Sequence, residues 1–163
     1  MPEARTMSRR AVLGGTAGIA LPALGGCGRA PAAPAPELAV LVGAIAAEQD
    51  LIALYEAARG AHASLAGRLA PVLAHHREHL AVLRRHYVPG SGRFARTAPL
   101  PAPRAQRVPG DPSGALAALR SAESRAAAAR AAEAGRAGPG LAQLLASIGA
   151  CEAGHAAALA RPA

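Results

Sequence analysis

The stretch from Leu141 to Leu159 reads LAQLLASIGACEAGHAAAL, and the spacing of its side chains decides the fold. Large apolar residues recur every three or four positions, which is the period of one face of an α-helix. The residues on this face are Leu141, Leu144, Leu145, Ile148, Glu152, His155 and Leu159. Glu152 and His155 interrupt the apolar stripe, and burying such groups costs free energy unless they are paired.

Three earlier segments show the same helical period. The four predicted helices span roughly Glu37–Arg59, Ser64–Tyr87, Pro112–Arg136 and Leu141–Leu159. Gly60 is expected to end the first, and Ser64 and Asp111 are the expected N-caps of the second and third. Pro71 cannot donate a helical hydrogen bond, so the second helix is predicted either to begin near Ala70 or to kink at Pro71.

The composition favours an all-α fold with a thin core. Aromatic residues make up 2% of the 163 residues and Trp is absent, which argues against a β-sandwich or barrel. Ala supplies more than half of the hydrophobic fraction, and its burial contributes little. The third helix offers only Leu116 and Leu119 as large apolar residues. We therefore expect modest stability, helped by a metal, a second subunit in a homo-oligomer, or a lipid surface.

Residues 88–112 are rich in Pro, Gly and Arg and show no periodicity, so they are predicted to form a long loop. A connection of this length is uncommon in a small domain unless it crosses the domain or has a function of its own. Two helical hairpins joined by a long crossover correspond to a four-helix bundle with ferritin-like connectivity over residues 37–163.

Residues 1–26 are predicted to form an export signal. Arg9 and Arg10 precede an uncharged apolar stretch that is too short to span a membrane. The segment around the two arginines resembles a twin-arginine signal, and Leu24-Gly25-Gly26-Cys27 resembles a bacterial lipobox. This interpretation predicts lipidation of Cys27, a Pro/Ala tether over residues 27–36 and anchoring to the outer face of the cell membrane. The alternative is an ordinary signal followed by an accidental Cys.

The net charge of +8 comes from 18 basic residues, all of them Arg, against 10 acidic ones. Such a charge attracts anionic lipid or nucleic acid. The scarcity of aromatic side chains disfavours base stacking, so no nucleic-acid partner is expected and an anionic membrane is favoured. Two cysteines exclude a disulfide framework and a Cys-rich zinc module.

Polar residues on the four inner stripes follow a repeated order. The first and third helices each carry one Glu, and the second and fourth each carry a pair three residues apart, which places both members on one face. These residues are Glu48, the pair His76 and His79, Glu123, and the pair Glu152 and His155. The separation from each Glu to the following pair is 28 residues in the first hairpin and 29 in the second.

This order resembles the ferritin-like carboxylate-bridged proteins, in which two helices each give a Glu and two give a Glu-x-x-His. The chain is most similar to small exported ferritin-like domains of actinobacterial type, and the resemblance covers about residues 37–159. It implies two iron or manganese ions, held by Glu48, His79, Glu123, Glu152 and His155. The mixed set of histidines and carboxylates suits a single zinc or iron ion as well. His76 stands where the family has Glu, so a bridging carboxylate is missing.

Two functions are open on these residues. The first is a membrane-anchored metal-binding bundle, with storage or redox chemistry of the metal as further possibilities. The second is a metal-free lipoprotein with a structural or protein-interaction role at the cell envelope. In that case Glu48 would accept a hydrogen bond beneath Tyr55, and Glu123 would form a solvated pair with Arg120 and Arg125.

Four further polar residues lie beside the stripes. His75, His86 and Glu78 are expected on the surface. Cys151 lies at the stripe edge beside Glu152, where a small buried hydrophobe is the default interpretation and a redox or metal role is the alternative.

Overall fold

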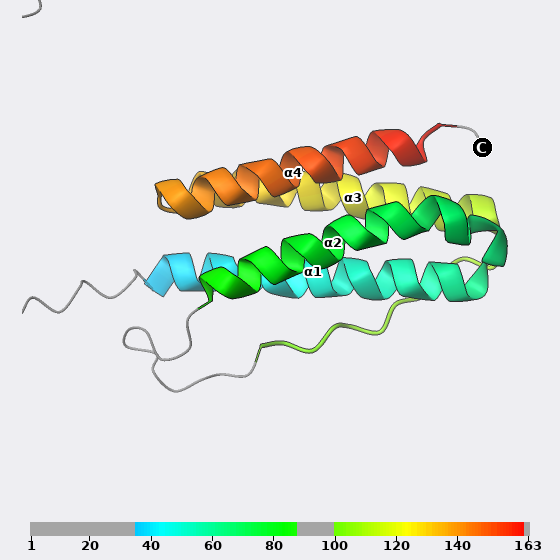
Figure 1. Cartoon of the computed structure of the whole chain (residues 1–163), viewed down its shortest axis with the longest axis horizontal. Helices are drawn as coiled ribbons and strands as arrows, with labels where there is room; N and C mark the ends of the chain where they lie inside the picture. The colour runs from blue at the N-terminus through cyan, green and yellow to red at the C-terminus, as the bar shows by residue number, and fades with distance from the viewer. Residues whose placement is uncertain (1–34, 88–99, 162–163) are drawn as a thin grey trace, which may run out of the picture. The chain divides into compact units, whose positions relative to one another are not determined.

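The computed structural model describes residues 35–87 and 100–161. The helices in these ranges are α1 (Ala35–Ala61), the short 3₁₀ helix η1 (Ala63–Leu65), α2 (Ala66–His86), α3 (Pro112–Ala134) and α4 (Pro139–Leu159). The described ranges hold no strand, so the prediction of an all-α four-helix bundle is confirmed (Figure 1). The predicted signal and anchor, with Arg9, Arg10 and Cys27, lie outside these ranges.

The helix starts agree with the sequence prediction at α3 and differ from it at α2. Asp111 caps α3, and its Oδ1 accepts a hydrogen bond of 2.7 Å from the backbone N–H of Gly114. The expectation that Ser64 caps the second helix is wrong, because Ser64 lies inside η1. The N–H of Leu65 instead donates to the carbonyl of His62 at 3.0 Å, so a backbone bond closes this turn.

Pro71 lies inside α2, which begins at Ala66 rather than near Ala70. Pro71 has no N–H to donate to the carbonyl of Gly67, four residues earlier. Both residues are exposed, so water can satisfy that carbonyl and the helix can continue through the proline.

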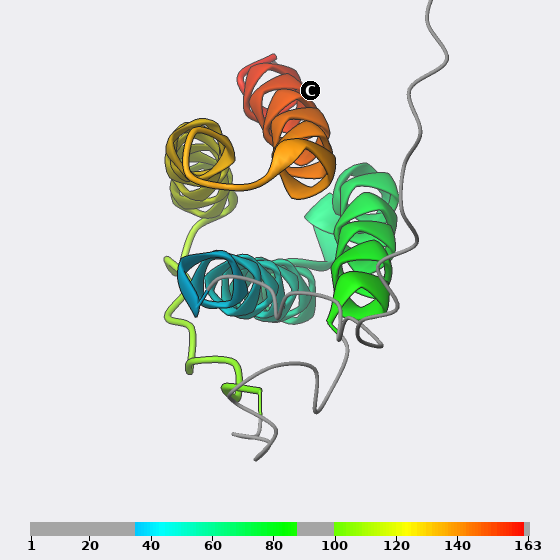
Figure 2. The same cartoon turned by 90° about the vertical axis from the view of Figure 1, so that its left-hand side faces the viewer.

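The helices pair as two hairpins, α1 with α2 and α3 with α4, which meet chiefly where α1 packs against α3 (Figure 2). Helices α2 and α3 run in the same direction, because the chain returns along the bundle between them (Figure 1). Residues 100–111 lie beside α1 on this return. The N–H and Nε of Arg104 donate to Asp50 at 2.7 and 2.8 Å, and His62 Nε2 lies 2.9 Å from the carbonyl oxygen of Pro109.

The interior is divided into two apolar clusters along the bundle axis. The first contains Val40, Leu41, Ala44, Ile45, Leu80, Leu83, Leu141, Leu145 and Ile148. The second contains Tyr55, Ala58, Leu65, Leu69, Val72, Leu73, Ala115, Leu119 and Leu159. Between them lies a polar layer of fully or largely buried side chains. We use the name polar layer for Glu48, His76, His79, Glu123, Glu152 and His155.

Helix α1 is the one described helix with the length and apolar composition of a membrane span. Glu48 nevertheless lies in its middle, is 0% exposed and contacts His76 of α2. That contact and the apolar residues of α1 in both clusters are features of a core helix in a bundle.

Candidate metal centre

The six residues predicted from the repeated order lie together in the polar layer. Glu48, His76 and Glu123 are 0% exposed, Glu152 is 1% exposed and His155 is 7% exposed. The alternative of a solvated Glu123 is therefore wrong. Glu123 lies one helical turn after the buried Leu119, whereas Arg120 and Arg125 point to solvent.

His76 lies at the centre of the layer and joins the two hairpins. Its Nδ1 is 2.9 Å from Glu48 Oε2, and its Nε2 is 2.8 Å from Glu123 Oε1. Both ring nitrogens can donate only when the imidazole is protonated. Burial opposes that charge, but the bonds to Glu123 and Glu48 outweigh burial and raise the pKa of His76 to about 9.

The same contacts keep the two carboxylates ionised. Burial raises the pKa of Glu123, but its contacts with His155 and His76 outweigh this effect and lower the pKa to about 2. Burial likewise acts against ionisation of Glu48, and contacts with His76 and His79 hold its pKa below the usual value. The layer therefore carries two negative charges and the positive charge of His76.

Two groups in this layer each bring one carboxylate and two imidazoles together. They are Glu48 with His76 and His79, and Glu123 with His76 and His155. In each group one ligand atom per residue lies within 4.8 Å of the others. Two histidines and one carboxylate are the donors of several catalytic zinc sites and of non-haem iron(II) sites. The residues present thus fit a transition-metal ion.

Two close contacts in these groups lack hydrogen-bond geometry. His79 Nδ1 lies 3.3 Å from Glu48 Oε1, and His155 Nδ1 lies 3.5 Å from Glu123 Oε1. All four atoms are buried, and neither nitrogen nor Glu48 Oε1 makes a hydrogen bond. Such unbonded donor atoms are available to a cation.

Glu152 also has a buried oxygen without a partner. Its Oε2 is buried and makes no hydrogen bond. Burial, followed by repulsion from Glu48, raises the pKa of Glu152 to about 8, although the Arg130 guanidinium opposes the rise. At neutral pH this carboxyl therefore holds a proton, which a cation could replace.

Helix α4 is held close to α3 by a glycine one turn before Glu152. A Cβ atom placed on Gly149 would lie 2.8 Å from the Cβ of Arg130, which is far inside van der Waals contact. Gly149 thus permits the close α3–α4 approach that brings Glu152 into the layer.

Two contacts near the layer were not predicted from the sequence. Tyr55 donates its hydroxyl to Glu123 Oε1 of α3 at 2.5 Å. Arg130 is 1% exposed, and its Nε lies 3.2 Å from Glu133 Oε2. Its position seven residues after Glu123, on the same helix face, was the available signal.

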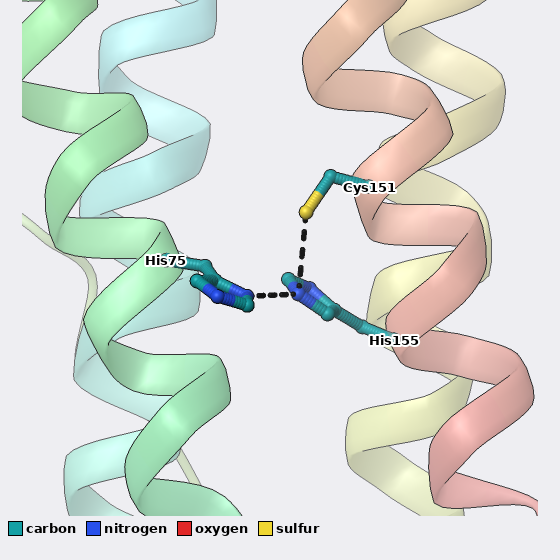
Figure 3. A group of neighbouring side chains, drawn as sticks. All are labelled: His75, Cys151 and His155. Carbon is teal, nitrogen blue, oxygen red and sulfur yellow. Dashed lines mark hydrogen bonds between the residues drawn. The ribbon is translucent and has the colours of Figure 1, made fainter.

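Three side chains form a second group at the edge of the layer (Figure 3). His75 Nδ1 lies 3.0 Å from His155 Nε2, and Cys151 Sγ lies 3.4 Å from the same nitrogen. His75 is exposed as expected, but its contact with His155 was not foreseen. Cys151 is half-buried rather than a core hydrophobe, and burial, with repulsion from Glu123, raises its pKa. Glu78 and His86 are exposed, as predicted.

The comparisons with known proteins add no family to this description. No protein-family model, curated protein or solved structure matches the chain. The ferritin-like resemblance therefore depends on the order and placement of the polar residues described above.

Proposed function

We propose that the polar layer binds a transition-metal ion of the zinc or iron(II) class between α1 and α2. The supporting observation is the approach of His79 Nδ1 to Glu48 Oε1 at 3.3 Å, between two buried atoms that make no hydrogen bond. His76 Nδ1, 2.9 Å from the other oxygen of Glu48, completes a set of two imidazoles and one carboxylate.

Glu152 is the fourth proposed ligand. Glu152 is 1% exposed and its Oε2 makes no hydrogen bond, so this carboxyl group is available to a cation in the layer. A divalent cation there would replace the proton on Glu152 and one proton on His76. The bound ion would supply Lewis-acid chemistry or, as iron, electron exchange.

Glu123 and Tyr55 support this set from outside. A metal-bound histidine usually donates its other ring N–H to a carboxylate, which fixes the tautomer and the ring orientation. His76 Nε2, 2.8 Å from Glu123 Oε1, fits this arrangement. The Tyr55 hydroxyl holds the same oxygen at 2.5 Å. We therefore assign Glu123 the role of a positioning residue.

The chain path supports a ferritin-like connectivity. Helices α2 and α3 run in the same direction, and residues 100–111, the described part of the connection between them, lie beside α1, as a crossover requires (Figure 1). The order of Glu48, His79, Glu152 and His155 follows the ferritin-like pattern, and His76 departs from it by replacing a bridging carboxylate with an imidazole.

A metal-free structural role is the second candidate, and one observation favours it. His76 contacts both carboxylates at 2.8–2.9 Å, so its imidazolium can supply the positive charge that the layer needs. In this alternative the histidine takes the place of a cation, and the layer fixes the register of the four helices.

Metal titration of purified protein distinguishes the two functions. Thermal unfolding is followed with chelator and with Zn²⁺, Fe²⁺ or Mn²⁺ for the wild type, Glu48→Gln and Glu123→Gln. A metal at a hundredfold excess over its Kd should stabilise the wild type by about 2.7 kcal/mol. Glu48→Gln should lose the part of this gain that comes from the polar layer, and Glu123→Gln should weaken binding there about 10- to 100-fold.

The matched control is Glu78→Gln, the same change at an exposed position of α2, which should respond like the wild type. If no metal shifts the wild-type curve, or if Glu48→Gln and Glu78→Gln respond alike, the metal-free role is favoured instead.

We also propose that the protein is exported and anchored by lipid at Cys27, as its lipobox indicates. Mass spectrometry of the membrane fraction should find a diacylated N-terminal Cys27. A soluble product cleaved at another position would contradict the anchor.

A further inference from the structure

We propose that His75, Cys151 and His155 form a second metal site, at the edge of the bundle, for a borderline-soft ion such as Zn²⁺. The site is separate from the buried ligands Glu48 and His79. It joins α2 to α4, and thus one hairpin to the other (Figure 3). Its donors are one thiolate and two imidazoles, a set that zinc binds well and that carboxylate-preferring ions bind poorly.

The distances between the donor atoms fit such an ion. With zinc bonds of the usual length, two tetrahedral nitrogen ligands lie about 3.3 Å apart, and a nitrogen and a sulfur ligand lie about 3.6 Å apart. The distances here are 3.0 Å between the histidine nitrogens and 3.4 Å between sulfur and nitrogen. All three donor atoms lie within 4.8 Å of one another. Shifts of a few tenths of an ångström would place them around an ion.

The two imidazoles are presented in a suitable orientation. His155 turns Nε2 toward Cys151 and His75, while its Nδ1 lies 3.5 Å from Glu123 Oε1. Nε2 of His155 is therefore the nitrogen that faces the other two donors, and Glu123 lies on the opposite side of the ring without a hydrogen bond to it. The rings of His75 and His155 are stacked with centroids 5.3 Å apart. Cys151 and His155 are four residues apart on α4 and so share one helix face.

The two helices that carry the site are fixed to each other nearby. Arg68, in the first turn of α2, donates to the carbonyl oxygens of Ala158 and Leu159 at the end of α4, at 3.1 Å each. Such bonds satisfy carbonyls that a helix end leaves free. The spacing of His75 from His155 is thus maintained by contacts that do not depend on a metal.

The position of the site indicates how an ion would reach it. His75 is exposed and Cys151 is half-buried, so solvent reaches two of the three donors. Zinc binding would release the thiol proton of Cys151 to solvent. An open fourth position would be filled by water.

Cobalt(II) is the probe for this site, because a thiolate ligand gives a near-ultraviolet charge-transfer band that nitrogen and oxygen ligands do not give. The purified full chain is titrated with Co²⁺ under a phosphine reductant. The wild type should show the band saturating at about one equivalent, and Zn²⁺ should displace it. Cys151→Ser should lose the band, and His75→Gln should weaken Co²⁺ binding at least tenfold.

Three controls make the outcome specific. Cys27→Ser removes the other cysteine and should keep the band, and His86→Gln changes an exposed histidine of the same helix and should have no effect. Glu48→Gln should also keep the band, because it removes only the buried site. The band is therefore expected whether or not the polar layer binds a metal. Absence of the band in the wild type, or its persistence in Cys151→Ser, would overturn the second site.

Discussion

The two hairpins present the same order of polar residues to one layer, yet the matching positions His76 and Glu152 differ in their hydrogen bonding. In the first, His76 contacts carboxylates with both ring nitrogens. In the second, the corresponding Glu152 is equally buried and its Oε2 makes no hydrogen bond. The difference of one residue type places a cation in one half of the layer and a protonated acid in the other.

The positions seven residues after each Glu show a second difference. Tyr55 follows Glu48 at this spacing, and Arg130 follows Glu123. Tyr55 donates across the hairpins to Glu123, whereas Arg130 remains within its own hairpin, beside Glu133. Equivalent helix positions therefore hold a neutral hydroxyl in α1 and a guanidinium in α3, and these groups have different partners. Their pairing determines which residues of the layer are free to bind a metal.

Of the changes considered, replacing His76 should have the largest effect on the free energy of unfolding. In His76→Leu, Glu48 and Glu123 stay buried without the imidazolium that faces both. Removing one partner of a buried ion pair typically costs about 3–5 kcal/mol. We expect a loss of that size in chemical denaturation at pH 6 with chelator present. His86→Leu, at the exposed end of α2, should change the unfolding free energy by less than about 0.5 kcal/mol. A loss below about 1 kcal/mol in His76→Leu would show that the imidazolium is not needed.

Replacing Glu152 should instead make the stability of the metal-free protein less dependent on pH. Its pKa of about 8 lies above the ordinary value of 4.5, so the folded state binds this proton more tightly than the unfolded state. The stability that Glu152 contributes is therefore full below pH 4.5 and is lost as the pH rises through 8. Between pH 5 and pH 8, Glu152→Gln should lose less stability than the wild type, by on the order of 1–3 kcal/mol.

Urea unfolding at these two pH values, with chelator, measures this difference. His76, whose pKa of about 9 is also raised, should leave a smaller residual loss above pH 6.5 in both proteins. Glu78→Gln, at an exposed position, should follow the wild type. Identical pH profiles for Glu152→Gln and the wild type would mean that the carboxyl is ionised in the folded protein.

Removing the hydrogen bond from Tyr55 to Glu123 should have the smallest effect on the free energy of unfolding. Tyr55→Phe deletes the hydroxyl that donates to Glu123 Oε1 but leaves the His76 contact in place. We expect a loss of about 1.5 kcal/mol in the free energy of unfolding, the lower end of the range for hydrogen bonds to charged groups. Tyr87→Phe, at the end of α2 and away from the layer, is the matched control. A loss no larger than that of Tyr87→Phe would remove Tyr55 from the site.

Helical periodicity was sufficient to predict the four helices and the six polar positions on their inner faces. The predicted and observed spans differ by a few residues at the ends, and by η1, which helical periodicity did not predict. Periodicity within one helix fixes which face a residue occupies. It therefore placed Glu123 and Glu152 inside the bundle.

Contacts between helices depend on how far each helix is shifted along its neighbour, and sequence spacing does not encode this shift. The hydrogen bond from Tyr55 to Glu123 and the approach of His75 to His155 were therefore not predicted. Arg130 was missed for a different reason, since a charged side chain is expected at the surface unless a buried partner is known. The close packing at Gly149 became evident only from the position of α3.

Anomalous diffraction from crystals grown with Zn²⁺ is the most direct test of metal binding in the polar layer. We expect a zinc-edge peak enclosed by Glu48, His76, His79 and Glu152, and we expect this peak to disappear in Glu48→Gln. A further peak beside Cys151 would belong to the second site and would not replace the first. Metal binding in the polar layer would be contradicted by crystals that hold Zn²⁺ at saturating concentration, show no peak in the layer and keep His76 in contact with both carboxylates.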